Sequence, residues 1–552
     1  MRGTKHLLLW TSLGTFLVLA FAAFSENVLA GWRRLQRAAA ERLPAGTGLE
    51  IHLRQVVVPQ TGAIDRCTTC HLGMQPGEST LVGDPLLKAH PPVVHDPAGF
   101  GCTVCHGGQG RATTTADAHG NVPHWPEPML PRRYLSAGCG TCHTHLAVPR
   151  LEALERGRAV FERTDCLACH RVSGRGGTMR PGGAGGAEGP DLSTVGIRGF
   201  RADWHEHHVA EHEKAAEGPW RSAFAPLPPA DREALGAYLT SLVGAPGLVE
   251  AKALFHTLGC RGCHAVGGVG GSDGPDLTRA GMLDPGQRSF VGVSGPRTVP
   301  GWLAEHFRAP ARVTAGSLMP EMALSEERID QLVLYVLSLR RAPLSQALWP
   351  TDRLRSERLG EREFSTDGAT LYGTFCAACH GQSGEGMRYP GLAAFPAVGS
   401  PDFLSLACDD FLAETVKRGR PGRRMPPWGD QLRPAEVTAL VGHLRALGGV
   451  ECRKDPRPPR WARGDVAEGG RIYASACAGC HGPKGEGGEG PMLANPVLQK
   501  SATDGYLADT IGRGRRGTGM AGFSEATPSR PALSPEEIES VVTFLRTWET
   551  KP

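Results

Sequence analysis

The sequence predicts a mostly α-helical protein: an N-terminal transmembrane helix, a loop-rich module, and then four small all-α domains. Three observations predict this fold class. Residues 7–24 are uncharged and mostly apolar. From about residue 151 onward, a pattern of short helix, cysteine motif, glycine-rich loop and amphipathic helix occurs four times. The 552 residues, with 74 glycines and 44 prolines, suit several loop-rich domains better than one core.

The apolar segment LLLWTSLGTFLVLAFAAF at residues 7–24 would span about 27 Å as a helix, close to the hydrocarbon thickness of a bilayer. A signal peptide is the alternative, because residues 28–30 form an acceptable cleavage site. GWRRLQRAAAERL at residues 31–43 continues the helical pattern. This continuation favours an uncleaved membrane anchor with its exit helix over residues 1–45.

Fourteen of the 16 cysteines fall in seven C-x-x-C-H motifs, here numbered first to seventh in chain order. This motif is typical of covalent c-type haem attachment, in which two thiols bond the porphyrin and the adjacent imidazole becomes the proximal iron ligand. Zinc ribbons and thioredoxin-like pairs are the alternatives, but seven copies that each end in histidine favour haem. The predicted attachment residues are Cys67, Cys70, Cys102, Cys105, Cys139, Cys142, Cys166, Cys169, Cys260, Cys263, Cys376, Cys379, Cys477 and Cys480. The predicted proximal ligands are His71, His106, His143, His170, His264, His380 and His481.

Seven haems would also explain the composition, because aromatic residues make up only 6% of the chain and each macrocycle is itself an apolar core element. Covalent haem attachment takes place outside the bacterial cytoplasmic membrane. We therefore expect a single-pass protein of that membrane with its bulk on the periplasmic side. The net charge of +4 and the absence of a basic stripe with interleaved aromatics leave nucleic-acid binding unsupported.

The four repeats predict domains at 151–245, 246–343, 344–452 and 453–552, here called the first to fourth modules. Each ends in an amphipathic helix with apolar residues at helical spacing. The predicted closing helices are PADREALGAYLTSL (229–242), SEERIDQLVLYVLSL (325–339), RPAEVTALVGHLRAL (433–447) and SPEEIESVVTFLRTW (534–548). One position aligns across them and is expected to pack helix on helix: Tyr238, Tyr335, His443 and Phe544.

These four modules resemble class I cytochrome c domains in the order of their motifs. In that family, a methionine in the loop before the last helix is the distal iron ligand. The resemblance implies this role for Met319, Met425 and Met520. It also implies that a proline carbonyl after the haem motif orients the proximal imidazole. The matching prolines are Pro190, Pro275, Pro390 and Pro491.

The first module has Ser222 where the methionine is expected. Four histidines precede this position, in DWHEHHVAEHEK: His205, His207, His208 and His212. We expect one of them to be the distal ligand. His212 is favoured as the nearest to the altered loop, and His208 is disfavoured because it aligns with His306 of a module that has a methionine. An open iron site is the alternative.

Residues 46–150 hold three motifs without the closing helix or the methionine loop, so this trihaem module follows another plan. Its extra histidines favour bis-histidine ligation. The candidates for the three distal ligands are His90, His95, His119, His124 and His145. The sequence does not say which histidine serves which iron.

The trihaem module also resembles the membrane-anchored multihaem c subunits associated with Rieske/cytochrome b quinol-oxidising complexes. The resemblance rests on DRCTTCHLGM, HDPAGFGCTVCHGGQG and CGTCH, and on GWRRLQR after the anchor. It implies a cytochrome b/Rieske-type partner. The two remaining cysteines, Cys408 and Cys452, are expected to form a disulfide in an oxidising compartment, with free thiols as the alternative.

These features predict a heptahaem cytochrome that passes electrons from a quinol-oxidising membrane complex to a soluble cytochrome or terminal oxidase. Met/His haems have higher potentials than bis-His haems, so the potential should rise towards the C-terminus. No hydrolase, Walker or Rossmann motif is evident. Two alternatives remain: a multihaem reductase or peroxidase with an open haem in residues 151–245, and a relay to extracellular acceptors.

Overall fold

The computed structural model describes residues 2–549 except 75–76, 79, 92, 178–188, 199, 201–202, 215–225, 342–343 and 529; at residues 2 and 212–214 it describes the backbone alone. The described chain is mostly helical, as predicted. Its strands form three short antiparallel pairs. They are β1 (Val56–Val58) with β2 (Ala63–Asp65), β3 (Arg171–Val172) with β4 (Arg175–Gly176), and β5 (Ala265–Val266) with β6 (Val269–Gly270).

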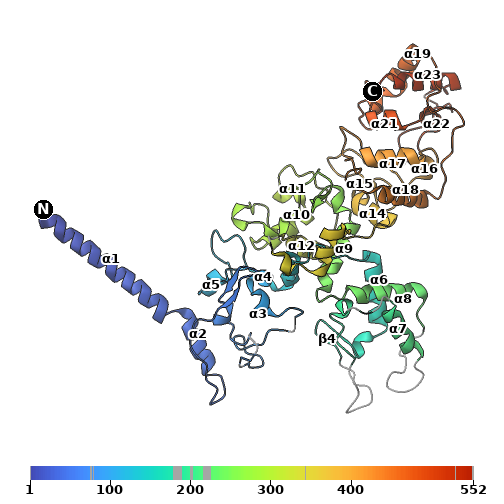
Figure 1. Ribbon diagram of the computed structural model, residues 1–552. Helices are drawn as coiled ribbons and strands as arrows, with labels where there is room; N and C mark the ends of the chain where they lie inside the picture. The colour runs from blue at the N-terminus through green and yellow to red at the C-terminus, as the bar shows by residue number, and fades with distance from the viewer. Residues whose placement is uncertain are drawn as a thin grey trace.

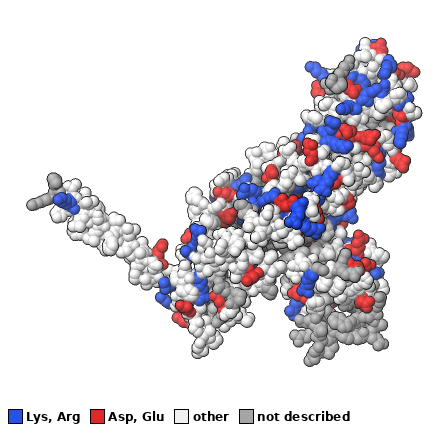
Figure 2. Space-filling model, viewed as in Figure 1, with Lys and Arg blue, Asp and Glu red and all other residues white. Residues whose placement is uncertain are grey.

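The N-terminal helix α1 (Arg2–Val28) extends away from the rest of the molecule, as Figure 1 shows. It is long and apolar enough to cross a membrane, and its large apolar side chains are exposed. In Figure 2 the helix carries charged side chains only towards its ends. The chain bends after Val28, and α2 (Gly31–Ala40) packs on the trihaem module rather than continuing straight. Gln36 of α2 donates to the carbonyl oxygens of His52 at 2.8 Å and Thr69 at 2.9 Å, which joins the exit helix to the first motif.

The trihaem module consists of loops and short helices; a small apolar cluster includes Leu72 and Leu87, whereas Leu130, Tyr134 and Ala137 join the core of the second module. The helices of the trihaem module are η1 (Cys67–Thr69), α3 (Pro97–Phe100), α4 (Thr103–His106), α5 (Thr115–Ala118) and η2 (Arg132–Thr141). So few apolar side chains over about a hundred residues agree with a module whose core is completed by bound groups.

In each of the four modules, the helix that precedes the attachment turn crosses the closing helix. The pairs are α6 (Leu151–Arg163) with α8 (Pro229–Ser241), α9 (Pro246–Thr257) with α12 (Glu326–Ser338), α14 (Gly368–Phe375) with α18 (Pro434–Gly448), and α19 (Val466–Ala476) with α23 (Pro535–Arg546). At three crossings a glycine permits the contact. A Cβ on Gly157, Gly368 or Gly469 would lie 2.0, 2.1 or 2.0 Å from a carbonyl oxygen of the partner helix.

In every module the aligned position of the closing helix packs against the helix that precedes the attachment turn, which confirms its predicted role. The ring centroids are 5.3 Å apart for Phe161–Tyr238, 4.7 Å for Phe255–Tyr335, 5.2 Å for Tyr372–His443 and 5.4 Å for Tyr473–Phe544. The same crossing is therefore built four times with different ring types.

Shorter helices complete the modules. They are η3 (Cys166–Ala168), η4 (Val195–Ile197), α7 (Trp204–Lys214), η5 (Cys260–Gly262), η6 (Ala280–Met282), η7 (Pro285–Gln287), α10 (Val299–Arg308), α11 (Pro310–Val313), η8 (Gln346–Leu348), α13 (Thr351–Leu359), α15 (Ala377–His380), α16 (Pro401–Leu404), α17 (Asp409–Arg418), α20 (Ala478–His481), α21 (Pro496–Ser501) and α22 (Asp504–Arg513). In Figure 1 the second module lies centrally, the third and fourth extend from it in a row, and the first lies to one side.

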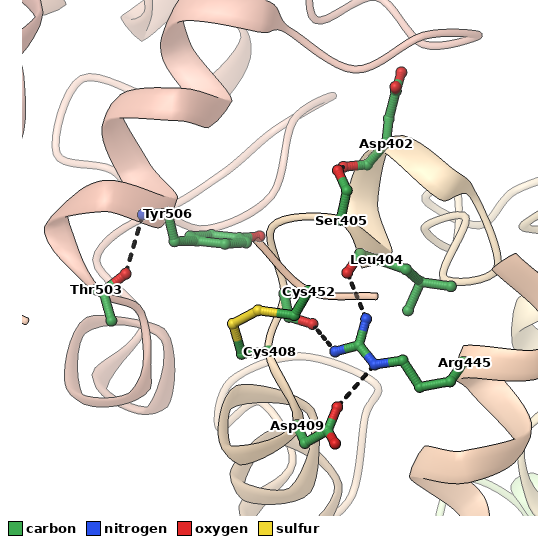
Figure 3. Close-up of a disulfide and its surroundings, with 10 residues drawn as sticks. Asp402, Leu404, Ser405, Cys408, Asp409, Arg445, Cys452, Thr503 and Tyr506 are labelled. Atoms are coloured by element: carbon green, nitrogen blue, oxygen red, sulfur yellow. Dashed lines mark hydrogen bonds and ion pairs between the residues drawn. A yellow bond between two sulfur atoms is a disulfide. The ribbon is translucent and has the colours of Figure 1, made fainter. Parts of the chain in front are cut away.

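The third module contains a disulfide between Cys408 and Cys452, with Cα atoms 5.0 Å apart (Figure 3). It joins the start of α17 to the segment after α18. Beside it, Arg445 of α18 donates to the carboxylate of Asp409 at 2.8 Å and to the carbonyl oxygens of Leu404 and Ala407. The disulfide and the arginine together fix the loop that precedes α17.

Candidate haem-binding sites

The seven motifs share one local structure. In each, the carbonyl of the first cysteine accepts hydrogen bonds from the amide of the second cysteine at 3.1–3.3 Å and from the amide of the histidine at 2.9–3.0 Å. Two thiols and one imidazole therefore arise from a single helical turn. None of the 14 motif cysteines, all of which the structure describes, takes part in a disulfide. This is the donor set that covalent attachment of haem requires.

In the four modules, a proline carbonyl holds the proximal imidazole. The Nδ1 atoms of His170, His264, His380 and His481 lie 2.9, 2.9, 2.8 and 2.8 Å from the carbonyl oxygens of Pro190, Pro275, Pro396 and Pro491. With Nδ1 occupied, Nε2 is the atom left for a metal. Burial lowers the pKa of His264 and His380, which favours the neutral imidazole that metal binding needs.

The expectation for Pro390 was wrong, because Pro396 holds His380 instead. The chain turns at Tyr389, whose hydroxyl donates to the carbonyl of Ala378 at 2.7 Å and whose carbonyl accepts from Leu392 at 3.1 Å. Pro390 lies inside this turn, and its carbonyl is not the one that contacts His380. The later proline then supplies the carbonyl.

In the trihaem module, each proximal histidine faces a second imidazole. The ring centroids are 6.5 Å apart for His71–His119, 6.2 Å for His106–His90 and 6.1 Å for His143–His95. A metal bonded to two imidazoles at about 2 Å leaves their ring centres about 6 Å apart. The three pairs therefore fit an iron held between them.

Two of the histidine candidates lie elsewhere. His124 is exposed and has a positive φ of 65°. His145 lies 2.8 Å from the hydroxyl of Thr144 and lines a cavity with Lys252 and Glu363. The structure brings neither ring against a proximal imidazole, because the loops that carry His90, His95 and His119 occupy those positions.

In the first module, His208 faces His170, with ring centroids 6.4 Å apart. His208 stacks on Trp204, one helical turn earlier on α7, at 4.9 Å. His205 is buried beside the same tryptophan, and the exposed His207 lies 2.8 Å from the carbonyl of Asp203. His208, which the sequence disfavours, is thus the described histidine of this group whose ring is found against His170. The side chain of His212 and the whole of Ser222 lie outside the described residues.

The three methionines occupy loops before the closing helices. Met425 and Met520 have matching hairpins, in which their carbonyls accept from the amides of Arg420 at 2.9 Å and Arg515 at 2.7 Å. Met319 is half-buried, packs on the apolar core of the second module and donates its amide to Ser317 at 3.2 Å. Met425 and Met520 therefore lie at equivalent positions of the same kind of hairpin in two different modules.

Motifs of different segments also contact each other. The amide of Thr103 in the second motif donates to Asp65, two residues before the first motif, at 2.9 Å. A Cβ on Gly262 of the fifth motif would lie 2.8 Å from the carbonyl oxygen of Phe375, directly before the sixth motif. The contacts show that neighbouring attachment turns lie against one another.

A buried ionic cluster joins the trihaem module to the second and third modules. Lys252 of α9 donates to Glu363 at 2.7 Å and to the carbonyl of Leu146 at 2.6 Å, and Arg261 pairs with the other oxygen of Glu363. Burial raises the pKa of Glu363, but the charges of Arg261 and Lys252 outweigh it and hold that pKa well below its usual range.

Comparisons with known proteins agree with this construction. Residues 154–243, 248–340 and 466–549 match the family model described as cytochrome c. Residues 365–444 match the model described as cytochrome c oxidase, cbb3-type, subunit III. Each match lies within one module.

Curated relatives include the cbb3-type cytochrome c oxidase subunit FixP of Bradyrhizobium diazoefficiens, 28% identical over 174 residues, which are 29% of this chain and 56% of the relative. Subunit CcoP of Cereibacter sphaeroides is 29% identical over 226 residues, 39% of this chain and 67% of the relative. The chain thus spans a little over half the length of the first of these relatives.

Among solved structures, a chain of the Kuenenia stuttgartiensis reducing HAO-like protein complex matches 33% of this chain and 96% of its own, at 18% identity and a TM-score of 0.24. This likeness carries no argument here. The repeated helix crossing, the attachment turns and the four family matches agree with one another. The chain is therefore a multihaem c-type cytochrome with several cytochrome c domains.

Proposed function

We propose that this protein carries seven covalent haems and passes electrons from a quinol-oxidising membrane complex to a soluble cytochrome or terminal oxidase. The observation that carries the proposal is the set of imidazole pairs. Every motif histidine whose segment lacks a matching methionine faces a second imidazole at 6.1–6.5 Å. Irons with two protein ligands suit electron transfer, whereas catalysis on a small molecule needs an open position.

The bound haems supply the one-electron couple, and the chain's residues set its properties. In this assignment His119, His90, His95 and His208 are the distal ligands opposite His71, His106, His143 and His170. Met319, Met425 and Met520 are the distal ligands opposite His264, His380 and His481. Bis-histidine ligation gives the lower potentials, so electrons enter near the membrane and leave from the second, third and fourth modules.

The helix α1 supports attachment to the membrane, and the chemistry of covalent haem supports a periplasmic location for the remaining chain. The relatives FixP and CcoP are subunits of a cbb3-type oxidase, which supports a membrane complex as partner. The resemblance of the trihaem module favours a cytochrome b/Rieske-type complex as the electron donor. We place the modules at 46–150, 151–245, 246–343, 344–452 and 453–552, after the anchor at 1–45.

A reductase or peroxidase would need an open iron. The first module was the candidate for it because of Ser222. His208 argues against this alternative, since its ring occupies the position facing His170 that a small ligand would need.

Carbon monoxide added to the fully reduced protein tests the proposal, because it binds only ferrous haem with a free coordination position. We expect no shift in the optical spectrum of the wild type, and a haem-to-protein ratio of seven. His208→Ala should give a shift equivalent to one haem. His124→Ala and His145→Ala are the matched controls and should give none. A shift in the wild type that His208→Ala leaves unchanged would contradict the assignment.

A further inference from the structure

The fifth and sixth motifs belong to different modules but lie against each other. The backbone just before and within the fifth motif lies against Phe375 and Ala378 at the sixth. Cys263 and Cys379 are the second cysteines of their motifs. Each is followed directly by a proximal histidine, His264 or His380. The two attachment turns, η5 and α15, therefore lie against one another.

Two glycines make this approach possible. A Cβ on Gly262 would lie 2.8 Å from the carbonyl oxygen of Phe375. A Cβ on Gly259 would lie 2.6 Å from the amide nitrogen of Ala378, and Gly259 also has a φ of +72°, which disfavours other residues. Both contacts are with backbone atoms, which cannot rotate away. A side chain at either position would push the two turns apart.

The haem motif itself does not require glycine at this place. The residue before the second cysteine is threonine, valine or alanine in five of the other motifs: Thr69, Val104, Thr141, Ala168 and Ala378. The seventh motif has Gly479 there, and a Cβ on it would meet nothing within 4 Å. Gly262 and Gly479 thus occupy the same motif position, but only Gly262 touches a second module.

Further contacts hold the two modules together around the turns. Gln431 accepts from the amide of Gly270 at 2.7 Å and donates to its carbonyl at 3.0 Å. Arg424 pairs with Asp273 at 2.8 Å. Gln382 donates to the carbonyl of Thr257 at 2.8 Å. The close approach is thus a built interface between the modules.

We propose that Gly259 and Gly262 are positioning residues that hold the fifth and sixth haems as an electronically coupled pair. The inference rests on the proposed function, because it requires haem on both motifs. One electron passes from the ferrous to the ferric iron of the pair, so one iron is oxidised as the other is reduced. No bond forms or breaks, and no proton moves. Because electron transfer slows steeply with distance, the glycines act by keeping the separation short.

The test compares Gly262→Ala with Gly479→Ala in the full-length, haem-loaded protein. Electron paramagnetic resonance of the oxidised protein measures the magnetic interaction between the two ferric irons, and potentiometric titration measures their mutual influence on reduction. We expect Gly262→Ala to weaken the magnetic interaction and to slow transfer between the pair severalfold, with seven haems retained. Gly479→Ala should match the wild type.

An unchanged spectrum and rate in Gly262→Ala would overturn the inference, as would a wild type with seven haems and no interaction between the fifth and sixth. If Gly262→Ala fails to fold, the same measurements are made on Gln431→Ala. This variant removes two hydrogen bonds between the same modules without adding a larger side chain. It should weaken the interaction in part, and an unchanged interaction would overturn the proposal. Loss of haem from either motif in the wild type would instead count against the proposed function.

Discussion

The ring of Trp204 lies one helical turn before His208 and stacks on it with centroids 4.9 Å apart, so the tryptophan orients the imidazole that faces His170. Trp302 and His306 repeat this stack in the second module, also at 4.9 Å. That module has Met319 as well. The tryptophan–histidine pair is therefore a structural feature of both modules, and in the proposed assignment its imidazole is an iron ligand in the module that lacks the methionine.

At the same scale, Met425→His should lower the reduction potential of one haem. An imidazole stabilises ferric iron more than a thioether does, and axial ligands tune haem potentials over a range of about 0.8 V. Potentiometric titration followed optically would show one high-potential component moving to lower potential. Met387→Leu, in the same module but outside the methionine hairpin, should leave every component in place. An unshifted titration of Met425→His would mean that Met425 is not a ligand.

At the scale of elements, the cluster of Lys252, Arg261 and Glu363 joins α9, η5 and the segment before α14. Glu363→Gln leaves two buried cations without their carboxylate. We expect a loss of about 3–5 kcal/mol in the stability of this junction, the usual cost of removing one partner from a buried ion pair. Hydrogen exchange of α9 and α14 measures it locally. Glu357→Gln, whose carboxylate pairs with Arg341 near the surface, should cost less than about 1 kcal/mol.

The same cluster predicts a pH dependence. The pKa of Glu363 is lower in the folded state than in the unfolded state. Its contribution to the free energy of unfolding is therefore fully present above the unfolded pKa of about 4.3 and is lost as the pH falls through the folded pKa. Hydrogen exchange should therefore show α9 opening more readily as the pH falls below about 4 in the wild type. Glu363→Gln should lack this component. An equal pH dependence in both proteins would exclude Glu363 as its source.

The disulfide between Cys408 and Cys452 also contributes to stability, in the third module. Cys408 and Cys452 are 44 residues apart in sequence, and closing a loop of that length in the unfolded chain corresponds to about 4 kcal/mol. Cys408→Ser with Cys452→Ser should destabilise the third module by an amount of that order. Reducing agent should lower the melting temperature of the wild type and leave that of the double variant unchanged. A double variant as stable as the oxidised wild type would contradict this role.

Some elements of the structure could be predicted from the sequence, and others could not. The motif turns, the closing helices and their packing residues follow from local patterns of cysteine, glycine and apolar spacing. The ligand pairs do not, because His90, His95 and His119 lie on loops whose positions depend on distant contacts. The alignment of His208 with His306 holds in the matching tryptophan stacks, but the sequence alone does not show that the His208 ring lies against His170. Pro396 replaced Pro390 because a local turn altered the loop.

At the scale of the whole molecule, the order of contacts differs from the order of the chain. The third motif packs directly on the second module: a Cβ on Gly140 would lie 1.8 Å from the carbonyl of Ser338, and Tyr134 donates to Asp330 at 2.6 Å. The second and third modules meet at Gly262 of the fifth motif and at Gly259 just before it. The third and fourth meet where Asn495 donates to the carbonyl of Pro421 at 3.0 Å. The first module lies beside this row, and Arg158 of α6 pairs with Glu250 of α9 at 3.0 Å (Figure 1).

This arrangement predicts that the haem of the first module is a side branch. In Cys166→Ser with Cys169→Ser, that haem is not attached, but the contact between the third motif and the second module remains. In rapid mixing with a reductant that enters at the trihaem end, the haems proposed to have methionine ligands should then be reduced at a rate within about twofold of the wild type. Loss of the third haem, in Cys139→Ser with Cys142→Ser, should slow it far more, because that haem lies on the direct route. If removing the first module's haem alone stopped the reduction, electrons would follow the order of the chain and the branch would be disproved.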